Sequence, residues 1–84
     1  MKTNLYELCE NATALIIKSG IGACDAYTDG DCICVDIPWG DWKHSHAYCD
    51  YLLGSELGLE LASVEVYDED GSDCFSAIRY YKQA

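Results

Sequence analysis

The chain has very few basic side chains. Between Lys18 and Arg79, Lys43 is the one Lys or Arg, against thirteen Asp or Glu, and the formal net charge of the 84 residues is -10. A surface of mixed charge would intersperse both signs, so this imbalance predicts a negative field around the folded protein. Such a field repels nucleic-acid phosphates, which excludes direct nucleic-acid binding, and it attracts basic protein partners.

Proline and long apolar runs are also scarce. With one Pro and 50% hydrophobic residues, the chain has too much apolar character to be disordered. No apolar run approaches the roughly 18 residues that cross a bilayer. Glu7 and Glu10 interrupt the stretch where the core of a signal peptide would lie. We therefore expect a single domain, residues 1–84, located in the cytoplasm and without a membrane partner.

The six cysteines have two interpretations, which depend on the compartment: Cys9, Cys24, Cys32, Cys34, Cys49 and Cys74. In a secreted chain they would suggest three disulfides, whereas in a reducing cytosol they are expected to be free thiols that behave as small hydrophobic residues. The two closest pairs, Cys32-x-Cys34 and His44-x-His46, do not have zinc-finger spacing. We expect no metal and no cofactor, and a small metal-binding or thiol-redox protein remains an alternative.

Apolar residues at helical spacing predict two helices. The first covers about 3–19 and ends at Gly20. The second covers about 42–57, with Asp41 as its N-cap. These two segments are expected to bury one apolar stripe each against the rest of the domain.

Alternating apolar residues predict four strands, at about 23–28, 32–37, 61–67 and 74–81. Asp29-Gly30 favours a tight hairpin between the first two, an acidic turn over 68–73 joins the last two, and Pro38-Trp39-Gly40 is expected to end the second strand. The order α-β-β-α-β-β predicts a two-layer α+β domain, with a four-stranded, mostly antiparallel sheet and both helices on one face. The order of the strands stays open. The expected core consists of Leu8, Ala12, Leu15, Ile33, Val35, Leu52, Val64, Val66 and Ile78.

The acidic turn at 68–73 does not have the spacing of a calcium loop. Counted from Asp68, Gly71 is fourth and Arg79 is twelfth, where an EF-hand needs Gly at the sixth position and Glu at the twelfth. The dipeptide Asp-Gly is common in hairpin turns, but a turn does not require the additional acidic residues of this segment. They serve either solubility or an interaction surface.

The segment 37–46 holds two Trp residues and two His residues. We expect Trp42 to close the thin core, whereas Trp39 either does the same or is an exposed binding hot spot beside Asp36 and Asp41. His44 and His46 do not share a helix face, and we interpret them as surface groups at the start of the second helix. No catalytic arrangement follows from these spacings, and a core this small leaves little room for a substrate cleft, so we expect no enzymatic activity.

In size, acidity and α+β organisation, the chain resembles small inhibitors encoded by phages and mobile elements, anti-CRISPR proteins above all. The stretches Gly40-Asp41-Trp42-Lys43-His44 and Glu69-Asp70-Gly71-Ser72-Asp73 also resemble short motifs of small proteins from gut-bacterial mobile elements. The resemblance implies a protein that occupies the positively charged nucleic-acid channel of a CRISPR effector. It covers the chain as a whole and assigns no role to any single residue.

The leading hypothesis is a non-enzymatic acidic binding protein, an anti-CRISPR-like inhibitor that docks on a basic nucleic-acid-binding groove of a host defence protein. Its carboxylates would replace phosphates opposite Arg and Lys, and an aromatic residue would anchor the contact. The alternative is a regulatory or structural domain whose acidity serves solubility. The candidate partner-binding residues are Asp29, Asp31, Asp36, Trp39, Asp41, Tyr67, Asp68, Glu69, Asp70 and Asp73.

Overall fold

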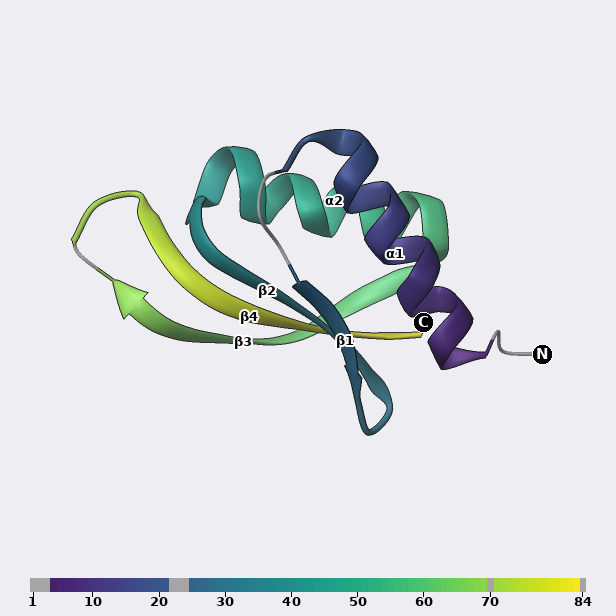
Figure 1. Cartoon of the computed structure of the whole chain (residues 1–84). Coiled ribbons are helices and arrows are strands. Elements are labelled where there is room, and N and C mark those ends of the chain that lie inside the picture. Colours follow the sequence, from purple (N-terminus) through teal and green to yellow (C-terminus); the bar gives the residue numbers. More distant parts are fainter. Residues whose placement is uncertain (1–3, 22–24, 70, 84) are drawn as a thin grey trace.

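The computed structural model describes residues 4–21, 25–69 and 71–83, except for the side chains of Trp42 and Lys43 (Figure 1). Its helices are α1 (Leu5–Ser19) and α2 (Ala47–Leu57), and its strands are β1 (Asp25–Asp29), β2 (Cys32–Asp41), β3 (Leu59–Glu69) and β4 (Cys74–Gln83). A π-helical turn, Trp42–His46, leads from β2 into α2. The predicted α+β class, with two helices and four strands, is confirmed.

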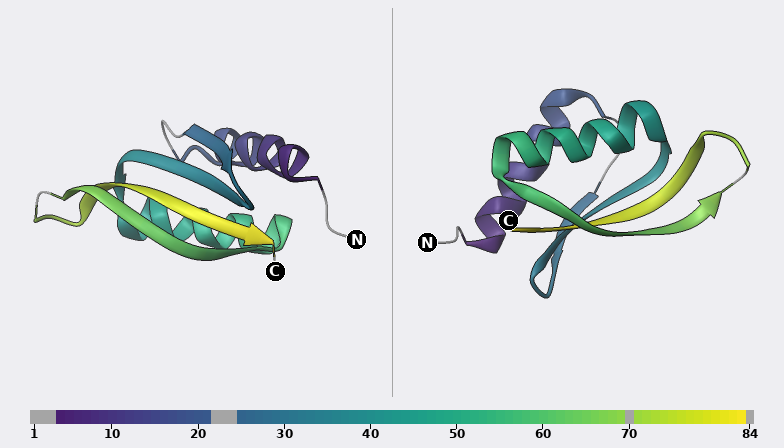
Figure 2. Two further views of the ribbon diagram at one scale, coloured as in Figure 1. Left: turned by 90° about the horizontal axis from the view of Figure 1, so that it is seen from below. Right: turned by 180° about the vertical axis from the view of Figure 1, so that it is seen from behind.

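The four strands form one fully antiparallel sheet in the order β1-β2-β4-β3. The strands β2 and β4 are central, and β1 and β3 are the two edges. Both helices lie on the same side of this sheet, as the views in Figures 1 and 2 agree. The other side of the sheet therefore carries no covering layer in the described part of the chain.

Polar side chains cap the start of α1 and of the π-helical turn that leads into α2, whereas the side chain of His46, at the N-cap position of α2 itself, makes no capping hydrogen bond. The side chain of Asn4 accepts hydrogen bonds from the amides of Tyr6 (2.9 Å) and Glu7 (3.3 Å) at the start of α1. The side chain of Asp41 accepts one from the amide of His44 at 3.1 Å, which confirms Asp41 as the cap of the second helical segment. Gly20, with φ of 76°, ends α1 in the left-handed conformation that glycine adopts without strain.

The core lies between the helices and the central part of the sheet. It consists of side chains from α1, β2, α2, β3 and β4, namely Leu8, Ala12, Ile16, Ile33, Val35, Ile37, Cys49, Leu53, Leu59 and Tyr81. The predicted burial of Leu8, Ala12, Ile33 and Val35 is confirmed, and Leu15, Leu52 and Ile78 are half-buried.

The predicted burial of Val64 and Val66 is wrong. These side chains are 39% and 45% exposed, although β3 alternates as the sequence suggests. The reason is the strand order, because β3 is an edge strand with a neighbouring strand on one side only in the described part of the chain. In β3 only Leu59, next to the end of α2, is buried.

The predicted end of the second strand at Pro38 is also wrong. β2 continues to Asp41, and the register with β4 shifts between Ile37 and Gly40. A bulge of this kind accommodates the missing amide of Pro in a central strand. Glycine is required at position 40, after the bulge, because a Cβ there would lie 2.6 Å from Cγ2 of Ile37.

Candidate functional site

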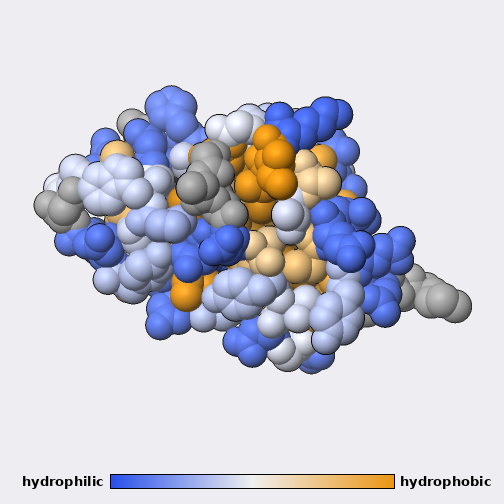
Figure 3. Space-filling view, viewed as in Figure 1, coloured by the Kyte–Doolittle hydropathy of each residue, from blue (hydrophilic) through white to orange (hydrophobic). Residues whose placement is uncertain are grey.

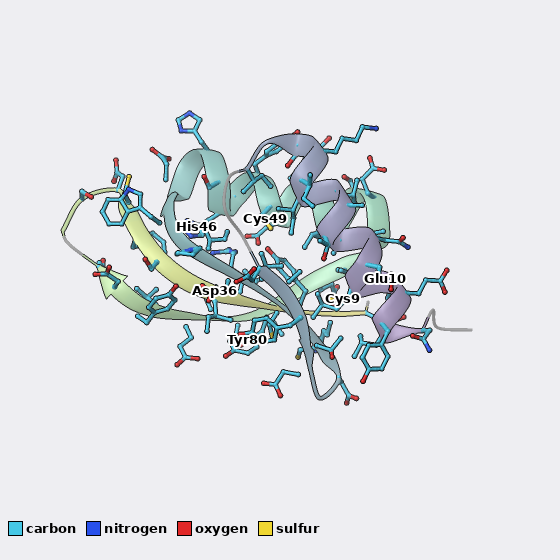
Figure 4. The ribbon with its side chains drawn as sticks, viewed as in Figure 1. Cys9, Glu10, Asp36, His46, Cys49 and Tyr80 are labelled. Carbon is cyan, nitrogen blue, oxygen red and sulfur yellow. The ribbon has the colours of Figure 1, made fainter. Side chains whose placement is uncertain are left out.

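The side of the sheet away from the helices forms a surface that we call the open face. Alternate β2 side chains turn towards the helices, namely Ile33, Val35 and Ile37, so Cys34 and Asp36 point to the open face. The strand register extends this face sideways, because Tyr27 of β1 and Tyr80 of β4 both lie opposite Cys34. Figure 4 shows Tyr80 on the underside of the sheet, with His46 and Cys49 on the side of α2.

The open face is rich in carboxylates and tyrosines. By register it carries six acids, Asp25, Asp29, Asp36, Glu60, Glu65 and Asp68, together with Tyr27, Tyr67 and Tyr80. Lys82, opposite Glu60, is the single basic residue that the described strands place there. This face therefore has a strongly negative potential.

A hydrogen bond between Tyr67 and Asp36 crosses the open face. The Tyr67 hydroxyl donates to Oδ1 of Asp36 at 2.7 Å, although Tyr67 belongs to edge strand β3 and Asp36 to β2. Because β4 lies between these two strands, the Tyr67 side chain spans it. The hydrogen bond to Asp36 raises the pKa of Tyr67, so the phenol stays protonated and keeps donating.

A second tyrosine holds a second carboxylate. The Tyr80 hydroxyl donates to Oε2 of Glu65 at 2.8 Å, between neighbouring strands β4 and β3. This bond raises the pKa of Tyr80 to about 12. Asp36 and Glu65 are thus each held by one phenol, which leaves further lone pairs on each carboxylate for a partner.

This arrangement suits the binding of cations. A carboxylate accepts charge-assisted hydrogen bonds from guanidinium or ammonium groups, and the faces of nearby tyrosine rings attract the same groups. Tyr27 and Tyr67 are 40% and 52% exposed, so their rings are accessible. The open face can therefore bind Arg and Lys side chains of another protein.

Four of the predicted partner-binding residues lie on the open face, namely Asp29, Asp36, Tyr67 and Asp68. Three more are exposed at the hairpin ends: Asp31 beside the β1–β2 turn, and Glu69 and Asp73 at the β3–β4 end. Trp39 is 59% exposed, so it does not close the core, and its role as a binding hot spot stays a prediction. Asp70 and the side chain of Trp42 lie outside the described residues.

Asp41 lies at the end of β2, opposite Cys74, and its contact with a partner stays a prediction. Its half-buried carboxylate caps the π-helical turn and also lies 3.1 Å from Nδ1 of His44. The sequence interpretation missed other residues of the open face, above all Tyr27, Glu65 and Tyr80. The sequence signal for these three residues was their position on the polar side of alternating strands. Only the register between the strands shows that they lie on one surface.

The helix side of the sheet holds buried polar groups with a structural role. Arg79 is buried and donates from Nε to Oδ1 of Asp50 at 2.8 Å, and the Tyr81 hydroxyl donates to the same oxygen at 2.6 Å. Burial lowers the pKa of Arg79, but its bonds with Asp50 and the charge of Asp50 raise it by more. The charge of Arg79 is therefore compensated by the half-buried carboxylate of Asp50.

The interpretation of His46 as a surface group is wrong, whereas His44 is exposed as expected. The His46 ring is fully buried and stacks on Phe75, with ring centroids 4.5 Å apart. Neither ring nitrogen has a hydrogen-bond partner among the described residues. Burial, followed by the charge of Arg79, lowers the pKa of His46, so the ring is neutral at neutral pH.

The described residues offer no other strong candidate site. Among them, no three His, Cys, Asp or Glu side chains converge on a possible metal position. None of the five described cysteines forms a disulfide with another described residue. Burial, followed by the charge of Asp29, raises the pKa of Cys34 to about 11, which keeps this thiol unreactive. No described helix is long and apolar enough to cross a membrane.

Comparison with protein-family models, with curated proteins and with solved structures gave no match to this chain. The functional argument therefore depends on the geometry and chemistry of the open face.

Proposed function

We propose that this protein is a non-enzymatic inhibitor that docks its open face on a basic, nucleic-acid-binding groove of another protein. The observation that supports the proposal is the combination of six carboxylates, three tyrosines and one Lys on a sheet face that no described element covers. The resemblance to anti-CRISPR proteins suggests that the partner is a CRISPR effector or another host defence protein.

The mechanism is steric and electrostatic. Carboxylates of the open face take the places of phosphates opposite Arg and Lys, while the exposed rings of Tyr27 and Tyr67 provide stacking surfaces. The phenols of Tyr67 and Tyr80 already hold Asp36 and Glu65 in place, so less side-chain entropy is lost on binding. The bound inhibitor then blocks the nucleic acid from its groove.

A second candidate function is a regulatory or structural domain whose acidity serves solubility. The acids are not confined to the open face, because Glu7 and Glu10 of α1 and Glu56 of α2 are also exposed. This distribution is what a general solubility role would produce. The two candidates differ in whether the position of a carboxylate matters or only the total charge.

Matched charge neutralisation separates them. Asp36→Asn with Glu65→Gln removes two charges from the open face and keeps an acceptor oxygen for each tyrosine. Glu7→Gln with Glu10→Gln removes the same charge from α1. Immobilised wild-type protein is used to capture host proteins at low salt, and the captured nucleic-acid-binding protein is then purified and titrated with each variant. We expect only the open-face variant to lose affinity, by about tenfold or more, and equal affinities would contradict the proposal.

A further inference from the structure

The outer edge of β3 is a long sheet edge without a neighbouring strand among the described residues. β3 has 11 residues and pairs only with β4, on one side. The other edge strand, β1, has 5 residues and packs against α1. An edge of this length presents unpaired backbone donors and acceptors, and it is the place where an additional strand can bind.

The two faces of β3 differ in chemistry. Three apolar side chains turn to the helix side, next to the central strands, and are 39–45% exposed: Leu61, Val64 and Val66. Glu60, Glu65 and Asp68 turn to the open face. A strand added to this edge would continue both faces of the sheet. Its side chains would therefore alternate between the apolar residues on the helix side and the acids on the open face.

A second copy of this chain fits the edge poorly. β3 carries four acids, Glu60, Glu65, Asp68 and Glu69, and no basic residue. Antiparallel pairing about Val64 would place Glu60 opposite Asp68 twice, and pairing about Glu65 would place that residue opposite itself. Like charges directly opposite each other destabilise a sheet. Register shifts at Ala62 and Tyr67 further limit regular pairing to Ser63–Val66.

We propose that the β3 edge binds an extended segment of the basic partner as a fifth strand, and that this segment alternates aliphatic residues with Lys or Arg. Its aliphatic side chains continue the row of Leu61, Val64 and Val66, and its basic side chains lie beside Glu65 and Asp68. This inference rests on the proposed function, because that function supplies a basic partner. It adds backbone pairing at β3 to the side-chain contacts of the open face.

The test uses three blocked nine-residue peptides of equal composition and charge. The first alternates Lys with Val or Thr, the second groups its Lys residues at one end, and the third is the alternating peptide with N-methylated backbone amides. Amide hydrogen exchange of β3 is measured with each peptide. At a free concentration of about ten times Kd, the alternating peptide should slow the outward-facing β3 amides roughly tenfold, and the other two should not.

Variants of the protein add a second readout. Val64→Ser with Val66→Ser removes two of the three side chains of the exposed aliphatic row and leaves the open-face acids intact, whereas Ile17→Ser removes an aliphatic residue that is 75% exposed on α1. We expect the β3 variant to weaken binding of the alternating peptide by about tenfold or more and the α1 variant to have no effect.

Other results would overturn the inference in distinguishable ways. Binding of all three peptides without protection of β3 would leave the proposed function standing and remove the fifth strand. Protection of β3 without peptide, together with a dimer in sedimentation, would assign the edge to a second copy. Failure of every peptide to bind at low salt would count against both proposals.

Discussion

His46 is the residue whose environment leads to the clearest pH dependence. Its ring is buried against Phe75, and burial and Arg79 lower its pKa below the ordinary value of 6.5, while Asp50 and Asp41 oppose the shift. The unfolded chain therefore binds more protons than the folded protein below pH 6.5. The contribution of His46 to stability is full above that pH and is lost as the pH falls towards the folded pKa.

Comparison of wild type with His46→Phe measures this contribution. Phe keeps a flat ring against Phe75 and cannot be protonated. Urea unfolding between about pH 8 and pH 5 should show that the stability of wild type decreases relative to that of the variant as the pH is lowered. His44→Gln, at a side chain that is 85% exposed, is the control. If the stabilities of wild type and His46→Phe changed with pH in the same way, burial of the His46 ring would not lower its pKa.

The Asp50–Arg79 pair leads to a prediction about stability. Asp50→Ala would leave the buried guanidinium of Arg79 without its carboxylate and should destabilise the protein by about 3–5 kcal/mol. Adding Arg79→Met should restore part of the loss, because the uncompensated charge is then gone. Chemical denaturation of both variants tests this. A double variant less stable than Asp50→Ala would contradict the argument.

At the scale of the elements, the difference between β2 and β3 can be tested with one substitution at two places. Val35→Ala removes two methyl groups from a fully buried site and should reduce the free energy of unfolding by about 2 kcal/mol or more. Val64→Ala, at a site that is 39% exposed, should change it by less than about 1 kcal/mol. Equal losses in urea unfolding would mean that β3 is covered in solution.

The same two residues show how far the fold follows from the sequence. Val35 and Val64 have the same alternating surroundings, so periodicity predicts correctly that both lie in strands. Periodicity does not say which strands are neighbours, and the position of β3 at the edge decides that Val64 is exposed. The helices were easier to predict, since caps such as Asn4 and Gly20 act within a few residues of the chain.

The candidate site was predictable to a similar degree. Asp36 and Tyr67 were expected to contact a partner, but their hydrogen bond, which spans 31 positions of the chain, depends on the strand order. Glu65 and Tyr80 were missed for the same reason, because their pairing is a contact between strands. A surface built from four strands becomes visible only when the register is known.

For the whole molecule, charge and shape act together. The net charge of -10 attracts basic partners from a distance, and this attraction decreases with salt because the screening length is about 10 Å at 0.1 M ionic strength. Figure 3 shows hydrophilic side chains over most of one side of the protein, with apolar atoms near the middle of the view beside the helices. Long-range attraction alone would not distinguish one acidic surface from another. The open face adds fixed carboxylates and aromatic rings, which can select an orientation.

Displacement of nucleic acid tests the central claim most directly. The captured and purified partner is loaded with a fluorescent nucleic acid, and wild-type protein, the Asp36→Asn/Glu65→Gln variant and the Glu7→Gln/Glu10→Gln variant are added in turn while fluorescence anisotropy is recorded. Our account predicts that wild type and the α1 variant release the nucleic acid at similar concentrations, and that the open-face variant requires about tenfold more or fails. Release by the open-face variant at the wild-type concentration, or binding of wild type without any release, would contradict it.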